Sequence, residues 1–307
     1  MNSVSENPVL APWTGPWGGV PAFDRIQVAH FKPALEEGMA AHLAEIDAIS
    51  NAPAPPTFAN TIVAFEKSGA PLTRALSLFG VCAGGLSTPD FQALETEMSP
   101  KLSAFRDSIM QNGKLFGRIK AVYDAPRGSL TAEQQRLLWR HYTAFTRQGA
   151  LLDEVKKAEL SALNQQLASL TTRFGQNLLG DEEEEVLVIE TREGLAGLSD
   201  AQIQAAAAEA TRRGKSGVWM ISNTRSAMEP FLTSSLDRPL RERAWRLWTS
   251  RGDNGNARDN NAIAAEILLL RAKKAKLLGF PTFAHWRLDD AMANDPQTAL
   301  DLMVSVW

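Results

Sequence analysis

The most constraining feature of this sequence is an apolar stripe at helical spacing in the stretch from about 153 to 179. Its members follow one another by 4, 3, 4 and 4 residues: Leu163, Leu167, Leu170, Phe174 and Leu178. Residues three or four positions apart lie on one side of an α-helix, so the stretch is predicted to be one helix of roughly 40 Å. Such a stripe packs along another helix, which indicates a mainly α-helical fold.

Similar apolar spacing, divided by breaker residues, predicts further helices along most of the chain. They are expected at about 30–49, 58–67, 72–82, 89–111, 115–123, 132–148, 200–213, 228–233, 239–250, 260–278 and 283–292. Capping boxes mark two of the starts, Thr131 with Gln134 and Ser199 with Gln202. A kink or break is expected near Pro100, because proline removes a backbone donor and crowds the preceding turn.

Two short apolar runs, at 186–189 and 218–221, interrupt the helical pattern and are typical of strands. With the helix between them they predict a small β-α-β insert in a multi-helix array with long antiparallel helices. The expected domain organisation is an N-terminal helical region at 1–180, a small α/β insert at 181–235 and a helical region at 236–307. The lead at 1–24 is rich in Pro, Gly and Trp, including Trp17 and Gly18, and is expected to be irregular.

Charge and composition exclude several classes of protein. The net charge is -3 and the pI about 5.9, so the whole-chain field repels nucleic acid. The arginines at 238–251 alternate with tryptophans, but Leu240, Ala244, Leu247 and Trp248 share one helical face, which favours a core helix. No apolar run approaches the ~18 residues of a membrane span, and the first 24 residues lack a signal-peptide pattern. A soluble cytoplasmic protein is expected.

The histidines offer no recognisable metal-binding pattern. One large class of zinc peptidases uses His-Glu-x-x-His, in which two imidazoles hold the metal and the glutamate activates its water. No histidine here precedes a glutamate: they are His30, His42, His141 and His285. Glu45 lies three residues after His42, the reverse of the Glu-x-x-His order of di-metal bundles, so a solvated helix face is favoured. His141 is interpreted as a partly buried packing residue.

The remaining candidates for chemistry favour structural interpretations. The single cysteine, Cys82, has apolar neighbours and no basic residue within a helical turn, which indicates a buried structural thiol. The five carboxylates at 181–185 lack the alternating ligands and central glycine of a calcium loop, so a solvated loop is expected. Nucleophile-elbow, phosphate-loop and dinucleotide-binding motifs are absent. Residue chemistry alone therefore assigns no catalytic, cofactor-binding or metal-binding residue.

The last residues predict a helix with an uncovered apolar face. Asp295 followed by proline is a typical helix start. Leu300, Met303, Val304 and Trp307 then fall on one face, with no capping or polar residue after them. An apolar face of this kind is expected to meet a partner. We therefore expect a truncated helix whose apolar face, with Met303 and Trp307, is exposed, frayed or buried in a contact with another molecule. The alternative is that this helix docks on the body of the chain itself.

Several stretches resemble the N-terminal portion of one zinc metallopeptidase family, that of thimet oligopeptidase, oligopeptidase A and bacterial peptidyl-dipeptidase. The clearest is 58–66, which reads Phe-Ala-Asn-Thr-Ile-Val-Ala-Phe-Glu. Others lie at 23–26, 30–34, 167–179, 277–281 and 284–286. Asn-Pro-Val-Leu at 7–10 and Asn-Gly-Lys-Leu-Phe at 112–116 favour the peptidyl-dipeptidase branch.

The resemblance implies a mostly helical enzyme with a deep channel between two halves, which trims dipeptides from peptide C-termini. In that family zinc is held by His-Glu-x-x-His and a downstream glutamate, both beyond the region seen here. The expected cofactor is therefore zinc in the complete enzyme and none in this chain. The expected partners are the missing C-terminal catalytic part, which region 236–307 would continue into, and a peptide substrate, with no nucleic acid and no membrane. The alternative is a self-sufficient helical binding or regulatory module without catalysis.

Overall fold

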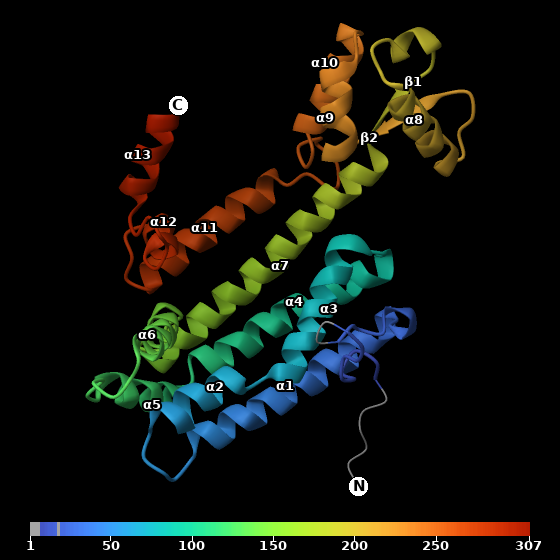
Figure 1. Ribbon diagram of the computed structural model, residues 1–307. Coiled ribbons are helices and arrows are strands. Elements are labelled where there is room, and N and C mark those ends of the chain that lie inside the picture. The colour runs from blue at the N-terminus through green and yellow to red at the C-terminus, as the bar shows by residue number, and fades with distance from the viewer. Residues whose placement is uncertain (1–6, 17–18) are drawn as a thin grey trace. The chain divides into compact units, whose positions relative to one another are not determined.

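The computed structural model describes residues 7–16 and 19–307, so Trp17 and Gly18 of the lead lie outside the described residues. These ranges are mainly α-helical and contain one two-stranded sheet, which confirms the expected fold class (Figure 1). The chain divides into two compact units. Unit 1 combines the residues up to 169 with 269–307, and unit 2 covers 170–268. The expected division at 1–180, 181–235 and 236–307 stays a prediction.

Unit 1 is built almost entirely from helices. Its elements are a 3₁₀ turn at Phe23–Arg25, α1 (Val28–Ser50), a π-helical segment at Phe58–Val63, α2 (Ala64–Lys67), α3 (Ala70–Gly85), α4 (Pro89–Met110), α5 (Gly113–Asp124), α6 (Ala132–Arg147), the first part of α7 (Glu154–Glu184), the second part of α11 (Asn261–Leu277), α12 (Phe283–Leu288) and α13 (Pro296–Val306). Within unit 1, α1 packs against both α3 and α4 (Figure 1).

Two apolar clusters hold these helices together. In the first, Phe31 of α1 meets Phe79 of α3 and Phe91 of α4 edge to face, with ring centroids 5.9 and 5.5 Å apart. The second joins α1, α5 and α6, where Phe116 stacks on Phe145 at 6.1 Å. Burying each phenylalanine contributes roughly 1.5–3 kcal/mol, which is why helices of modest intrinsic stability persist here.

Unit 2 contains the expected small sheet. Its elements are the rest of α7, β1 (Val186–Ile189), a 3₁₀ turn at Arg192–Leu195, α8 (Asp200–Arg212), β2 (Trp219–Ser222), α9 (Arg225–Ser234), α10 (Arg238–Thr249) and the start of α11. The strands are antiparallel, with Val186 opposite Ser222 and Ile189 opposite Trp219. Leu187, Phe231 and their neighbours form a separate apolar core beside the sheet.

Local signals in the sequence locate the helix ends well. In both capping boxes the Thr131 or Ser199 side chain accepts from the backbone N–H three residues on, and the glutamine side chain accepts in return. Helix α4 continues through Pro100, so a break there is wrong, and the kink expected as its alternative stays a prediction. Burial of Met98 and its apolar neighbours holds this helix, so the loss of one backbone bond does not end it. In the described ranges, no helix is long and apolar enough to cross a membrane.

Candidate functional site

The four histidines are not gathered in one site, and each ring forms a hydrogen bond with a different partner. His30 Nδ1 accepts from the Gln27 backbone at 3.0 Å; the other ring contacts are His42 with Ser68 at 3.0 Å, His141 with Glu66 at 2.8 Å and His285 with Thr282 at 2.8 Å. Among the described residues, no group of three or more His, Cys, Asp or Glu side chains is arranged to hold a metal ion. The donor sets present in these ranges therefore do not fit zinc.

His42 and Glu45 stabilise the turn before α3 instead of forming a metal site. The Glu45 carboxylate accepts from the Gly69 backbone N–H at 2.6 Å, while the His42 ring contacts Ser68. Gly69 has a φ of +72°, and a Cβ there would lie 2.5 Å from the His42 ring. The His42 side chain is half-buried, and this burial lowers its pKa. Glu45 lies at an exposed position, as a solvated face predicts, whereas His42 is only partly exposed because the turn at 68–69 lies against its ring.

The structural interpretations of Cys82 and His141 are confirmed. Cys82 is buried in the first apolar cluster, and burial raises the pKa of its thiol, which disfavours the reactive thiolate. The half-buried His141 ring packs edge-on against Phe65 with centroids 5.1 Å apart. Both side chains therefore contribute to packing.

The expectation of a solvated loop at 181–185 is wrong. Four of the five carboxylates lie inside α7, which continues to Glu184. Asp181 is fully buried and accepts from the Gly252 backbone at 2.7 Å and from Asn254 at 2.9 Å. The next three carboxylates pair with arginines from other segments: Glu182 with Arg251, Glu183 with Arg212 and Arg213, and Glu184 with Arg258. The run therefore contacts distant segments of unit 2, through hydrogen bonds of Asp181 and ion pairs of the next three carboxylates.

The interpretation of 238–251 as a core helix is confirmed. Ala244 of α10 is fully buried, and Leu240, Leu247 and Trp248 pack against the same core. Arg246 pairs with Glu242 one turn earlier, and the Arg251 guanidinium lies 3.8 Å over the Trp248 ring. These two arginines therefore interact with side chains of the same helix.

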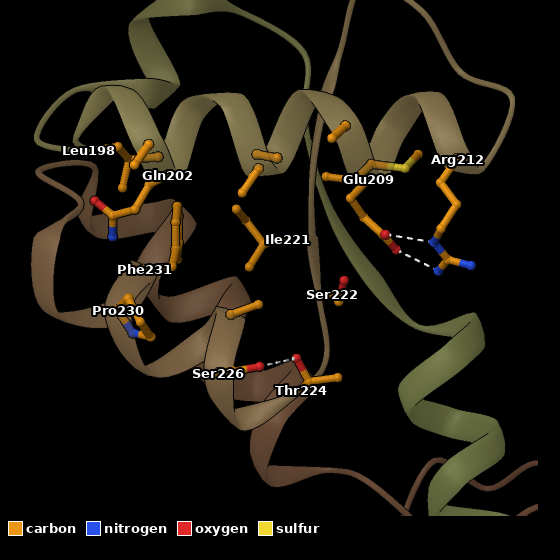
Figure 2. A pocket seen from close by; sticks show the side chains of 16 residues that line it. Leu198, Gln202, Glu209, Arg212, Ile221, Ser222, Thr224, Ser226, Pro230 and Phe231 are labelled. Atoms are coloured by element: carbon orange, nitrogen blue, oxygen red, sulfur yellow. Dashed lines mark hydrogen bonds and ion pairs between the residues drawn. The ribbon is translucent and has the colours of Figure 1, made fainter. Parts of the chain in front are cut away.

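A pocket of about 660 Å³ lies in unit 2 between α8 and α9, beside β2 (Figure 2). Helix α8 lines it with small apolar side chains, those of Ala201, Ala205, Ala206 and Ala208. Figure 2 shows Ile221 and Phe231 between the two helices, and Glu209 paired with Arg212 at one end. The pocket was not predicted from the sequence, because the alanines of α8 have the pattern of ordinary small helix positions.

A buried polar cluster in unit 1 joins three helices. Lys274 of α11 donates to the Asn164 side chain of α7 at 2.7 Å, and Asn164 donates to Asp107 of α4 at 2.8 Å. Burial lowers the pKa of Lys274 to about 8, and burial raises the pKa of Asp107. The two charged groups lie far apart in the sequence, and neither has a motif around it.

A family model described as peptidase family M3 matches residues 231–306. The dipeptidyl carboxypeptidases of Salmonella typhimurium and Escherichia coli are each 36% identical to this chain over 301 residues, which is 98% of this chain and 44% of the relative. Oligopeptidase A of Haemophilus influenzae is 27% identical over 93% of this chain and 42% of its own length. The chain thus spans less than half the length of these curated relatives. It belongs to peptidase family M3.

Proposed function

We propose that this chain is the N-terminal, non-catalytic part of a zinc metallopeptidase of the peptidyl-dipeptidase or oligopeptidase type, and that it forms one wall of the substrate channel. The observation that carries the proposal is 36% identity to two dipeptidyl carboxypeptidases over 98% of this chain but only 44% of each relative. The described residues contain no group of three or more His, Cys, Asp or Glu side chains that could hold a metal ion. The proposal therefore includes a zinc site in the remainder of the polypeptide.

The exposed apolar face of α13 supports the proposal that another part of the polypeptide packs against this helix. No residue of α13 is buried within this chain, and the side chains of Met303 and Trp307 are both exposed, as their spacing predicts. An isolated helix of this length is marginal in water, and exposed apolar faces mark surfaces that are covered by a partner. We infer that the catalytic part covers α13. A cytoplasmic location is part of the same proposal.

The test is to read the gene beyond codon 307 and to express the complete product. We expect an in-frame continuation that contains His-Glu-x-x-His. We also expect the complete product to release dipeptides from peptide C-termini, and a chelator to abolish this activity. The isolated chain should hydrolyse nothing. A stop codon directly after Trp307 would refute the fragment and favour the binding or regulatory module.

The wall role has its own test in the complete enzyme. A substrate peptide that carries a photoreactive side chain is expected to label residues within 1–307 as well as residues of the catalytic part. Labelling confined to the catalytic part would refute the wall role but leave the fragment assignment intact.

A further inference from the structure

The pocket beside β2 lies against an unpaired strand edge. The sheet in the described ranges has two strands, so β2 pairs with β1 on one side only. Three successive residues, Met220, Ile221 and Ser222, line the pocket. Successive side chains of a strand point to opposite faces, so a hollow that touches three in a row lies along the strand's edge.

That edge carries free backbone groups. In an antiparallel pair, alternate residues direct their N–H and C=O away from the partner strand. Throughout 7–16 and 19–307, no backbone hydrogen bond from a turn or loop reaches residues 219–222. The outward groups of β2 are therefore available to an incoming strand.

The walls of the pocket suit a short extended chain. The alanines of α8 leave space next to the strand edge, and Pro230 and Phe231 of α9 form the opposite apolar wall. A volume of about 660 Å³ falls within the ordinary range for ligand sites, roughly 300–1,000 Å³. A peptide strand uses such a site through main-chain bonds, with alternate side chains in the apolar walls.

Charge in the pocket selects against ionic ligands. Glu209 accepts from Arg212 at 2.8 Å and from Arg213 at 2.6 Å. At the other end Thr224 and Ser226 are shared with a second hollow, where Arg225 pairs with Glu229 at 3.0 Å. Because these lining charges are mutually neutralised, the site favours an uncharged occupant over a phosphate or nucleic acid.

We propose that the pocket between α8 and α9 binds a free peptide in extended form, which adds a third strand to the sheet at the edge of β2. The occupant has small apolar side chains and no charge along the bound stretch. This site lies within unit 2, and peptide binding there does not depend on the proposed peptidase activity. The strand-addition proposal and the proposed function can therefore be refuted separately.

The probe is a fluorescein-labelled, terminally blocked Ser-Val-Ala-Val-Ser peptide, titrated by polarisation into residues 1–307 and into the complete gene product. Saturable binding to both is expected. Two N-methylated versions of the peptide carry their methyl groups on opposite sets of alternate residues, and they should differ in affinity. The version whose methyl groups face β2 should bind at least about tenfold more weakly than the other, because its hydrogen bonds to the strand are lost. Equal binding of both methylated versions and the parent peptide would refute strand addition.

Substitutions locate the site. Ala205→Trp fills the pocket and should weaken binding by about tenfold or more. The control, Gln204→Trp, changes the neighbouring residue, which is equally exposed but does not line the pocket, and should leave binding unchanged. Circular dichroism and urea unfolding check that both variants fold. An unaffected Ala205→Trp variant would place the peptide elsewhere and overturn the proposal.

Two other occupants are outcomes of the same experiment. Binding to residues 1–307 but not to the complete product would mean that the rest of the polypeptide covers the pocket. Residues 1–307 could instead bind no peptide and form a dimer that the Ala205→Trp substitution dissociates. That result would assign the pocket to a second copy of the chain. Either result would overturn the free-peptide site.

Discussion

Lys274 is a buried cation that costs this fold stability at neutral pH. Only 8% of the residue is exposed, and its ammonium donates to Asn164 and lies 4.5 Å over the Trp286 ring. Burial is the main cause that lowers its pKa to about 8; Asp107 opposes this shift and Arg106 adds to it. The charged form is therefore less stable in the folded chain than in the unfolded one.

The sign and size of the pH effect follow from the two pKa values. The unfolded chain has the ordinary lysine pKa of 10.5, so between pH 8 and 10.5 it binds a proton that the folded chain does not. The free energy of unfolding therefore rises with pH across that window, by about 3 kcal/mol in full. Between about pH 7 and about pH 9.5 the expected gain is about 2 kcal/mol.

Lys274→Met removes the titrating group and keeps a long apolar stem, so the variant should lack this gain. The matched control is Lys276→Met, two residues further along α11 at an exposed position. Urea unfolding followed by circular dichroism at both pH values gives the free energies. Other groups titrate equally in both variants and cancel in the comparison. The same pH dependence in the two variants would refute the reasoning.

Three further predictions concern buried polar groups and backbone strain. Asp107→Asn removes the carboxylate that raises the pKa of Lys274, so the rise in unfolding free energy should begin at a lower pH in the same urea assay. Asp181→Ala leaves two donors of the turn after α10 without an acceptor and should lower the unfolding free energy by about 3 kcal/mol; no change would contradict the assigned bonds. Gly197→Ala places a Cβ 2.2 Å from a backbone oxygen at a φ of +91°, and should destabilise more than Gly214→Ala, where φ is +70° in open space and the expected cost is about 1 kcal/mol. Equal melting temperatures of these two glycine variants would exclude the clash.

Signals that act within one or two turns were predictable from the sequence. The capping boxes at Thr131 and Ser199 depend on residues three positions apart, and the helices begin where those pairs place them. The two strands follow in the same way from short apolar runs, to within one residue. Their antiparallel pairing depends on the helix between them and was not assigned in advance.

Features set by distant residues were not predictable. The carboxylates at 181–185 have no cation nearby in the sequence, so a solvated loop was the natural expectation. In the fold, arginines from three later segments meet them, and α7 continues through most of the run. Lys274 and Asp107 likewise share a hydrogen-bond network only because α4, α7 and α11 meet. Neither arrangement leaves a local pattern.

The same distinction explains why one apolar surface was anticipated and the other was not. The face of α13 belongs to a single helix, so the spacing of Met303, Val304 and Trp307 is enough to reveal it, and all three are exposed. The pocket beside β2 is made by α8, β2 and α9, whose individual residues look like ordinary small or apolar positions. Its defining property is the free backbone edge of β2, which has no residue signature. A strand edge becomes visible only when the sheet is known to end there, and so this site required the structure.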